Sequence, residues 1–299
     1  MVIINIQGGA PAQLPKAPLS IALGNFDGVH RGHAELVKAA VRRAAQLGAS
    51  SAVWTFTSNP FGVPHITSLE EKLGLLEEMG VKYAVVCPFD EISSFSAEEF
   101  ADLLISLGTV YCVCGFNYSF GRGAQGTAPL LRELMSKHGV ETDIIDPVIA
   151  NGAPVSSTRI RKHLLAGEME EATALLGRPY FFIYPVTHGN EIGRTIGFPT
   201  INQRLLPERA ELKKGVYICR CMGGAALTNI GTRPTVCDDG EIISETHIID
   251  YSGDLYGLPV KVEFLSFLRE EKKFASLDEL KSRLKIDLVE ARDYKISGE

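Results

Sequence analysis

The sequence lacks any apolar run close to the roughly 18 residues that a membrane-spanning helix requires. Its opening stretch, MVIINIQGGA, contains neither the basic segment nor the sustained apolar segment of a secretion signal. We therefore expect a protein that is neither membrane-embedded nor secreted, and we expect a cytoplasmic location.

An excess of basic residues is also absent. The chain has 30 Lys and Arg against 36 Asp and Glu, which gives a formal net charge of −6. A broad nucleic-acid-binding surface depends on clustered positive charge, so we expect no nucleic-acid partner. An acidic chain can still contain a local basic pocket for a small phosphorylated ligand.

Cys-x-x-Cys pairs, which are typical of metal and redox sites, do not occur among the six cysteines. Cys112 and Cys114 are separated by one residue, and so are Cys219 and Cys221, each pair within a strand-like run. Side chains at that spacing share one face of a strand, where small thiols pack well. We expect buried, reduced thiols.

The 299 residues suffice for two domains. Up to about residue 180, short continuous apolar runs alternate with helical patterns, as in a parallel sheet buried on both faces. This alternation predicts a doubly wound α/β domain. The expected strands cover 20–24, 51–56, 83–89, 109–115 and 141–148, and the expected helices cover 33–48, 69–80 and 128–139, with a further helix begun by a capping box of Ser96 and Glu99.

After residue 180, short β-like runs are separated by Gly, Pro, Asn and Asp, which predicts an antiparallel β-barrel or sandwich. Residues 276–291 form an amphipathic pattern capped by Ser276 and Glu279, which predicts a C-terminal helix. Its apolar stripe comprises Leu277, Leu280, Leu284 and Leu288. A helical joint near 160–183 separates the halves, so we expect domains at 1–183 and 184–299.

The stretch GNFDGVHRGH, residues 24–33, lies where a parallel strand ends and a helix begins. Ligands of open α/β sheets bind at this edge, and helix N-termini present N–H groups to anions there. His30 and His33 stand one turn apart and point the same way. Two imidazoles at a phosphate site could donate hydrogen bonds to charge that develops during phosphoryl chemistry. The alternative is a glycine-rich turn with incidental histidines.

A second stretch, SSTRIR at 156–161, opens a later helix, where Ser157 and Thr158 could cap the helix and bind phosphate. Arg161 would add a positively charged guanidinium fork. On its own, this stretch favours an ordinary helix N-cap.

A third stretch, HGNEIGRTIGFPTIN at 188–202, has Gly189, Gly193 and Gly197 at intervals of four residues in a region of β texture. Such spacing suits a loop folded tightly over phosphates, or a glycine-rich barrel turn. The Thr200 hydroxyl and the Asn202 amide oxygen are hard ligands suitable for Mg²⁺.

Together, residues 24–33 and 156–161 resemble the HxGH nucleotidyltransferase superfamily in the form found in bacterial FAD synthetases. Residues 71–86, 95–100 and 115–127 resemble other segments of that family. The resemblance implies that ATP phosphates are bound by the loop residues Gly24, Asn25, Phe26, Asp27 and Gly28, and that the flavin pocket includes Asn117, Tyr118 and Phe120. Core packing is the alternative role for the two aromatic residues. In TFTSNPFGVPHIT, residues 55–67, Asn59 replaces a histidine of the family pattern.

Residues 188–202 resemble the riboflavin kinase signature Gly-x-Pro-Thr-Ala-Asn, with Ile201 in place of alanine. Matches continue in family order through NIGTRPT (229–235), ETHIID (245–250), DLYG (254–257) and a segment at 267–280. The resemblance implies that Glu245 is the base that receives the substrate hydroxyl proton, and that Arg269 is a flavin-side or lid residue.

The combined resemblance, over residues 20 to about 292, predicts a bifunctional riboflavin kinase/FMN adenylyltransferase. Such an enzyme would use ATP with Mg²⁺ and take riboflavin, FMN and FAD as small-molecule partners, as a monomer or weak homo-oligomer. Two alternatives remain open. One is a riboflavin kinase whose adenylyltransferase half is impaired around Asn59, and the other is a flavin- or nucleotide-sensing regulator.

Overall fold

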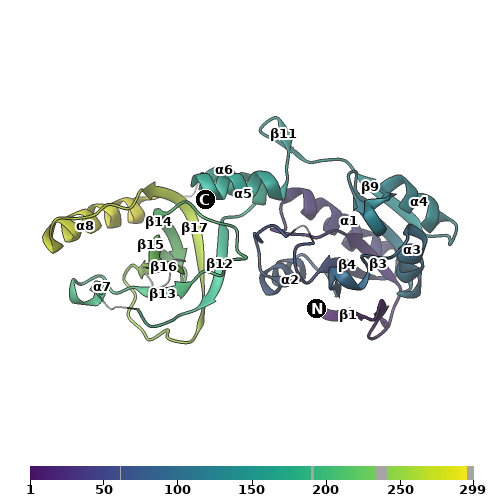
Figure 1. Ribbon diagram of the computed structural model, residues 1–299, viewed down its shortest axis with the longest axis horizontal. Coiled ribbons are helices and arrows are strands. Elements are labelled where there is room, and N and C mark those ends of the chain that lie inside the picture. The colour runs from purple at the N-terminus through teal and green to yellow at the C-terminus, as the bar shows by residue number, and fades with distance from the viewer. Residues whose placement is uncertain (61, 190–191, 234–240, 295–299) are drawn as a thin grey trace. The chain divides into compact units, whose positions relative to one another are not determined.

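The computed structural model describes residues 1–60, 62–189, 192–233 and 241–294. The chain forms two compact units, Met1–Ser157 and Thr158–Glu299 (Figure 1). The residues 158–183 therefore pack with the second unit, whereas the sequence placed the functional boundary at 183. That functional boundary stays a prediction, since packing and function need not divide at one residue.

The first unit contains a twisted sheet in the order β2-β1-β5-β4-β3-β6-β9. All neighbours in it are parallel except β2, which is antiparallel to β1. The strands are β1 (Val2–Gln7), β2 (Ala10–Pro11), β3 (Leu19–Leu23), β4 (Ser50–Phe56), β5 (Tyr83–Cys87), β6 (Thr109–Gly115) and β9 (Glu141–Ile145). The four short strands β7 (Ser119–Phe120), β8 (Gly126–Thr127), β10 (Ile149–Ala150) and β11 (Ala153–Pro154) form two small hairpins.

Helices cover both faces of this sheet, as the continuous apolar strands predict. The four helices of the first unit are α1 (Arg31–Leu47), α2 (Leu69–Glu78), α3 (Ala97–Ser106) and α4 (Ala128–Ser136). Leu36 of α1 and Leu76 of α2 belong to one apolar layer, while Phe100 of α3 and Leu131 of α4 belong to the other. The doubly wound α/β prediction is confirmed.

Local signals place the helix ends correctly. Gly48 ends α1 in the left-handed conformation, at φ 64°. Ser96 and Glu99 form the predicted capping box of α3, and Ser68 and Glu71 form another at α2. In the first unit, the sequence analysis missed β1 and the two-residue strands β2, β7, β8, β10 and β11.

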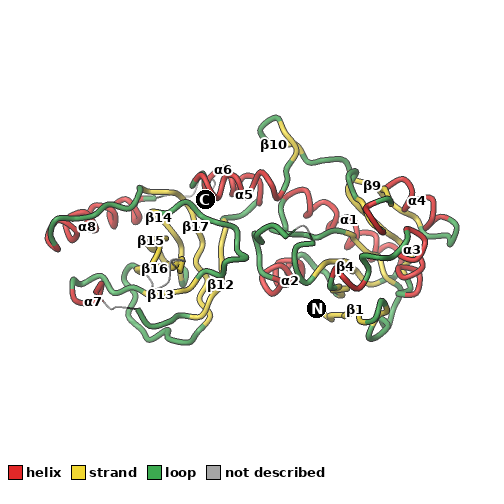
Figure 2. The backbone as a smooth tube through the Cα atoms, in the orientation of Figure 1, coloured by secondary structure: helices red, strands yellow, loops and turns green. Residues whose placement is uncertain are grey.

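The second unit begins with α5 (Ser157–Ala166) and α6 (Met169–Leu176), which precede a sheet in the order β12-β17-β14-β15-β16-β13. All its strand pairs are antiparallel, and the bridge between Thr187 and Asn202 joins the two ends of the order. This confirms the barrel (Figure 2). Its strands are β12 (Tyr180–Pro185), β13 (Ile201–Arg204), β14 (Gly215–Cys221), β15 (Gly224–Arg233), β16 (Glu241–Ile248) and β17 (Pro259–Arg269).

The C-terminal helix α8 (Leu277–Asp293) packs its Leu288 and Ala291 on the outer face of β14 and β15. Ser276 caps it as predicted, but the Glu279 carboxylate accepts a hydrogen bond from the Ala275 N–H, so the expected box with Ser276 does not close. Leu277 is 59% exposed and lies outside the buried part of the predicted apolar stripe.

The cysteines follow the prediction as far as the structure describes them. Cys87, Cys112, Cys114, Cys219 and Cys221 are buried and unpaired. Burial raises the pKa of Cys87 and that of Cys114 to about 12, so both remain thiols at neutral pH. No helix in the described parts of the chain combines the length and the apolar character needed to cross a bilayer.

A buried carboxylate fastens α8 to the barrel. Asp287 of α8 is fully buried and accepts hydrogen bonds from Arg269 of β17, at 2.7 Å from one terminal nitrogen and 3.0 Å from Nε. Arg283, one turn before Asp287, forms a second ion pair with it at 2.7 Å. Removing one partner of such a cluster leaves the other charges uncompensated.

Asp287→Ala should therefore lower the free energy of unfolding of the second unit by about 2–4 kcal/mol. Urea unfolding followed by far-UV circular dichroism measures this loss. The single tryptophan, Trp54, lies in β4 of the first unit, so its fluorescence transition should not move. Asp293→Ala, at an exposed position of the same helix, is the control. Equal stability of the two variants would contradict the assignment.

Candidate functional sites

The loop after β3 lies at the switch point of the parallel sheet. β3 lies between β4 and β6; the chain proceeds from β3 to β4 on one side, and from β6 to β9 on the other, so the connections after β3 and β6 run in opposite directions. Loops at this position form the ligand crevice of doubly wound sheets. The sequence motif at 24–33 occupies this position.

The backbone of this loop turns through several left-handed conformations. Gly28 has φ 82°, and the non-glycine residues Phe26 and Val29 have φ 54° and 41°. Positive φ is unfavourable for a β-branched residue, so the surrounding contacts must hold Val29 in place. Such strain is concentrated at functional sites.

The two histidines meet at the start of α1. His30 is the N-cap residue, and its Nδ1 accepts a hydrogen bond of 3.2 Å from the His33 N–H. Their rings stack with centroids 3.6 Å apart, and Phe26 packs edge-on against His33. The structure therefore brings the predicted pair together at a helix N-terminus, where the helix dipole favours anions.

Asp27 shapes the loop from within. Its carboxylate accepts hydrogen bonds from the N–H groups of Ile66 and Thr67, at 2.8 and 3.3 Å. Its carbonyl accepts a hydrogen bond of 2.9 Å from the Ser157 hydroxyl. Ser157, the first residue of α5, is therefore hydrogen-bonded to the phosphate-loop candidate, residues 24–33.

Lys72 is a residue that the sequence analysis did not select. Its side chain on α2 is 5% exposed, and its Nζ donates to the carbonyls of Asn25 and Phe56, each at 3.0 Å. Burial lowers the pKa of Lys72 to about 8, against the opposing effect of the nearby Asp27 charge. The only signal in the sequence was a lysine among the apolar positions of a helix.

The predicted flavin residues of the first unit differ in environment. Phe120 is buried and contacts Phe100 of the core, and Tyr118 stacks on Phe120 at 5.8 Å. Asn117 is exposed. Core packing therefore accounts for Phe120, and a flavin contact of these residues stays a prediction. Asn59 lies beside residue 61, which is outside the described residues.

Thr158 and Arg161 lie on α5, within the second unit, directly after Ser157. Their role at the phosphates stays a prediction. In the barrel, Asn190 and Glu191 of the third motif, and Pro234 and Thr235 of NIGTRPT, lie outside the described residues.

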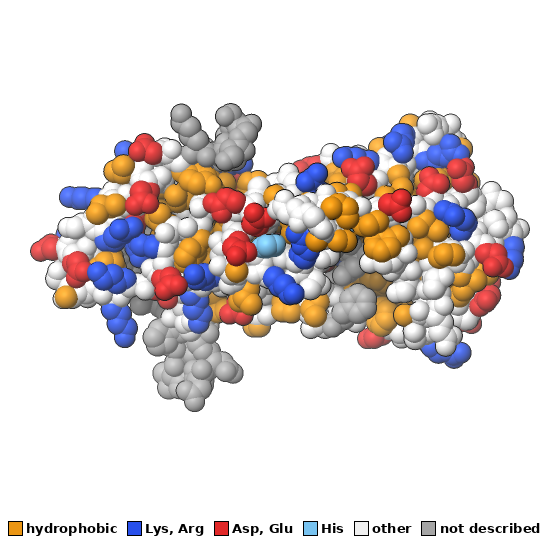
Figure 3. Space-filling view, turned by 90° about the horizontal axis from the view of Figure 1, so that it is seen from above, with side chains coloured by type: hydrophobic (Ala, Val, Ile, Leu, Met, Phe, Trp, Pro, Cys, Tyr) orange, Lys and Arg blue, Asp and Glu red, His pale blue; other side chains and the backbone are white. Residues whose placement is uncertain are grey.

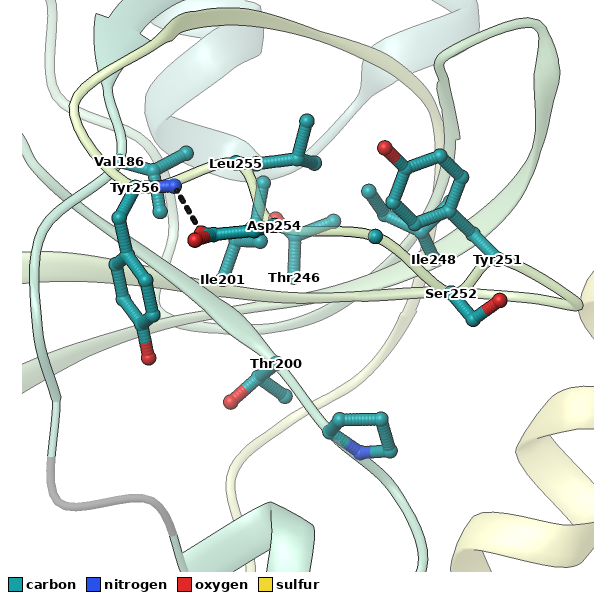
Figure 4. A pocket seen from close by; sticks show the side chains of 12 residues that line it. Val186, Thr200, Ile201, Thr246, Ile248, Tyr251, Ser252, Asp254, Leu255 and Tyr256 are labelled. Carbon is teal, nitrogen blue, oxygen red and sulfur yellow. Dashed lines mark hydrogen bonds between the residues drawn. The ribbon is translucent and has the colours of Figure 1, made fainter.

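Two clefts occupy the second unit. The first, the Tyr256 cleft, has a volume of about 580 Å³ and is bordered by Thr200, Thr246, Asp254 and Tyr256 (Figure 4). The second, the Glu245 cleft, has a volume of about 340 Å³ and is bordered by Thr200, Glu245 and apolar residues of the barrel and α8. Thr200 borders both clefts, so the two clefts adjoin at this residue.

Strand alternation explains why the clefts lie on opposite faces of β16. Ser244 and Thr246 are fully buried, whereas Glu245 and His247 point to the other face and are half-buried. Glu245 is in register with Asn202 of β13 and Asn229 of β15. Glu245 therefore has an amide residue as its cross-strand neighbour on each side, and Asn229 lines the Glu245 cleft with it.

His247 and the glycines fix the loop that presents Thr200. The ring Nδ1 of His247 forms a hydrogen bond of 2.7 Å with the Pro199 carbonyl, and Phe198 packs edge-on against the same ring. A Cβ at Gly193 would lie 2.3 Å from the Phe198 carbonyl oxygen, so the loop folds this closely only with glycine there. The sequence analysis did not select His247, which lies two residues after Glu245 on the same face of β16.

The predicted metal ligands offer only neutral oxygen donors. Asn202 is buried beneath Gly189, where a Cβ would lie 2.5 Å from the amide group. Within residues 1–60, 62–189, 192–233 and 241–294, no three His, Cys, Asp or Glu side chains gather as a metal site. This donor set fits Mg²⁺ that reaches the protein already bound to phosphate oxygens.

Arg269 borders the Glu245 cleft, although Asp287 holds its guanidinium. It also lies 5.9 Å from the centre of the Phe274 ring. Its position agrees with the prediction of a flavin-side residue, and the contact itself stays a prediction.

Comparisons with known proteins match both halves. Residues 13–159 match the FAD synthetase family model, and residues 176–295 match the riboflavin kinase family model. The bifunctional riboflavin kinase/FMN adenylyltransferase of Escherichia coli K12 is 34% identical over 95% of each chain, and the one from Bacillus subtilis is 33% identical over 92% of each. The chain belongs to the bifunctional riboflavin kinase/FMN adenylyltransferase family.

In this chain the FAD synthetase match precedes the riboflavin kinase match. A solved structure from Streptococcus pneumoniae, described as a macrolide-efflux protein, has a TM-score of 0.87 and 31% identity over 99% of this chain and 100% of that one. The family assignment rests on the two domain matches and the relatives of nearly full length.

The close approach of Gly193 generates a structural prediction. In Gly193→Ala, the added methyl group displaces the Phe198 carbonyl, which breaks the hydrogen bonds from the Ile196 and Phe198 N–H groups to the Gly193 carbonyl. Both amides should exchange hydrogen at least about tenfold faster. Gly224→Ala, where a methyl group finds ordinary contacts, is the control. Unchanged exchange in Gly193→Ala would refute the close approach.

Proposed function

We propose that this chain phosphorylates riboflavin with ATP in its second unit and adenylylates the resulting FMN with ATP in its first unit. The two family matches support both activities. The observation that carries the kinase half is the position of Thr200 at the border of two clefts, one of which contains Glu245. Phosphoryl transfer needs this arrangement, in which donor and acceptor approach one point from two sides.

In the kinase half, ATP would occupy the Tyr256 cleft and riboflavin the Glu245 cleft. Glu245 would receive the proton of the ribityl hydroxyl as that oxygen attacks the γ-phosphorus, and ADP would leave. Asn202 and Asn229 are the cross-strand neighbours of Glu245 on the two adjacent strands. Thr200 and Asn202 would hold Mg²⁺, which offsets phosphate charge when bound.

In the adenylyltransferase half, the FMN phosphate would attack the α-phosphorus of a second ATP, and pyrophosphate would leave. His30, His33 and the N–H groups at the start of α1 would stabilise the charge on the transferring group. The family resemblance also assigns Ser157, Thr158 and Arg161 to phosphate binding, and the Ser157 hydroxyl donates to the Asp27 carbonyl of the loop. A phosphate nucleophile is already ionised at neutral pH, so the histidines act as hydrogen-bond donors and not as bases.

The distribution of charge bears on the remaining partners. On the face that Figure 3 draws, the described Lys and Arg side chains are interspersed with Asp and Glu, without an extended basic region. Together with the net charge of −6, this supports small-molecule partners and no nucleic acid. A cytoplasmic monomer or weak homo-oligomer remains our proposal.

The experiment that tests the proposal is a time course with purified protein, riboflavin, ATP and Mg²⁺, with flavins separated by chromatography. FMN that rises and then yields FAD supports both activities. Accumulation of FMN alone would favour the kinase-only alternative, and unchanged riboflavin would favour the regulator.

Glu245→Gln should reduce FMN formation by about 10²–10⁴-fold, because the amide cannot accept the hydroxyl proton. The conversion of added FMN to FAD should be unchanged, since Glu245 lies in the second unit. Both rates are measured on the same preparation, so each serves as the control for the other. Loss of both activities in a folded variant would show that the two-site assignment is wrong.

His30→Asn separates the chemical role of His30 from its capping role. Asparagine keeps a side-chain acceptor for the His33 N–H, so α1 should remain capped. FAD formation from FMN should fall at least about 10²-fold, because a donor to the transferring phosphoryl group is lost. FMN formation should persist, and a variant that still makes FAD at the normal rate would contradict the role of His30.

A further inference from the structure

The buried ammonium group of Lys72 lies at the carboxyl ends of two parallel strands. Its Nζ is 3.0 Å from the Asn25 carbonyl, in the loop after β3, and 3.0 Å from the Phe56 carbonyl, the last residue of β4. The same cation therefore joins the ends of two adjacent strands at the edge where the phosphate-loop candidate begins.

The Asn25 carbonyl accepts a second hydrogen bond, of 2.9 Å, from the Thr55 hydroxyl. Two donors fix the plane of the peptide that connects Asn25 to Phe26. In a trans peptide the N–H points opposite to the carbonyl, so the Phe26 N–H points away from Lys72. Phe26 is also one of the loop residues held at positive φ.

The surroundings of Lys72 make a structural role alone an inadequate explanation. Burying an ammonium group is costly unless it is well bonded, and a neutral side chain of similar length would fill the same space on α2. The charged group that acts on Lys72 is Asp27, whose carboxylate accepts from the Ile66 and Thr67 N–H groups, while Glu71, the residue before Lys72, accepts from the Ser68 N–H at the start of α2. The hydrogen bonds of the Lys72 ammonium group go to the backbone carbonyls of Asn25 and Phe56.

We propose that Lys72 is a positioning residue for adenylyl transfer: its ammonium group fixes the Asn25–Phe26 peptide and places a positive charge behind the ATP-phosphate loop. This inference rests on the proposed adenylyltransferase function of the first unit. Its effect reaches the phosphates through the loop backbone and through the electric field of the buried charge, which is weakly screened.

The protonation of Lys72 gives the proposal a distinctive signature. Because burial lowers its pKa to about 8, the folded protein loses this charge as the pH rises above 8. Between about 8 and the ordinary value of 10.5, the unfolded chain binds more protons than the folded chain, so the stability of the first unit rises with pH. Adenylyl transfer should fall over the same range, in the opposite direction to stability.

The test compares Lys72→Met with wild type and with Lys82→Met, an exposed lysine of the same unit. At pH 7, Lys72→Met should lower kcat/KM for FAD formation from FMN about tenfold or more, the value of a hydrogen bond to a charged group. FMN formation from riboflavin, by the other unit of the same chain, should stay unchanged in all three proteins.

As the pH rises through 8, the ratio of the wild-type rate to the Lys72→Met rate should fall toward 1. Over the same range, Trp54 fluorescence should show that the first unit of the wild type becomes no less stable. A ratio that stays constant with pH, or equal rates at pH 7, would overturn the proposal. If Lys72→Met does not fold, Lys72→Arg decides, because its permanent charge should preserve the rate above pH 8 where wild type declines. Wild type that forms no FAD would refute the proposed function instead.

Discussion

The chain leaves β3 through a loop that could not hold its shape by itself. Phe26 and Val29 have positive φ, which costs free energy that the surroundings must supply. The Ser157 hydroxyl and the Lys72 ammonium donate to carbonyls of this loop, and the Asp27 carboxylate of the loop accepts from the Ile66 and Thr67 N–H groups. The stacked histidines depend on that loop, because His30 is at once its last residue and the cap of α1. The site of the first unit is thus a strained backbone held by buried polar groups.

In the barrel, the site residues are positioned by side-chain alternation along one strand. Here the alternation of side chains along β16 directs Thr246 to one cleft and Glu245 to the other. His247 then uses the same face as Glu245 to hold the Pro199 carbonyl, so one strand supplies both the acidic group and the support of the opposing loop. The glycines permit the loop to approach Asn202 and Phe198 at distances that any larger residue would prevent.

Most of the architecture could be predicted from the sequence because local rules agreed with the fold. Continuous apolar strands, the cap at Gly48 and the box at Ser96 each identified their elements correctly. The strand β1 was missed, since a six-residue run at the start of the chain carries no turn signal before it. The Glu279 carboxylate accepts a hydrogen bond from the Ala275 N–H and not from the Ser276 N–H that a capping box requires. The residue types at 276 and 279 do not distinguish the two arrangements.

Site residues could be predicted where they lie together in a sequence motif. They could not be predicted where residues far apart in sequence come together only in the folded chain. The histidines of 24–33 are adjacent in sequence, and the structure brings their rings together. Lys72 and His247 reach their loops from 47 and 48 residues away in sequence, and neither pattern nor spacing reveals such contacts. Phe120 shows the converse, because an aromatic residue within a motif lies in the core.

Thr200 has a thermodynamic consequence for the barrel. This residue lines both clefts, so a molecule that moves its side chain in one cleft alters the other. By linkage such an influence is mutual: whatever free energy the first occupant adds to the binding of the second, the second adds to the binding of the first. The affinity of each cleft for its occupant therefore depends on whether the other cleft is occupied.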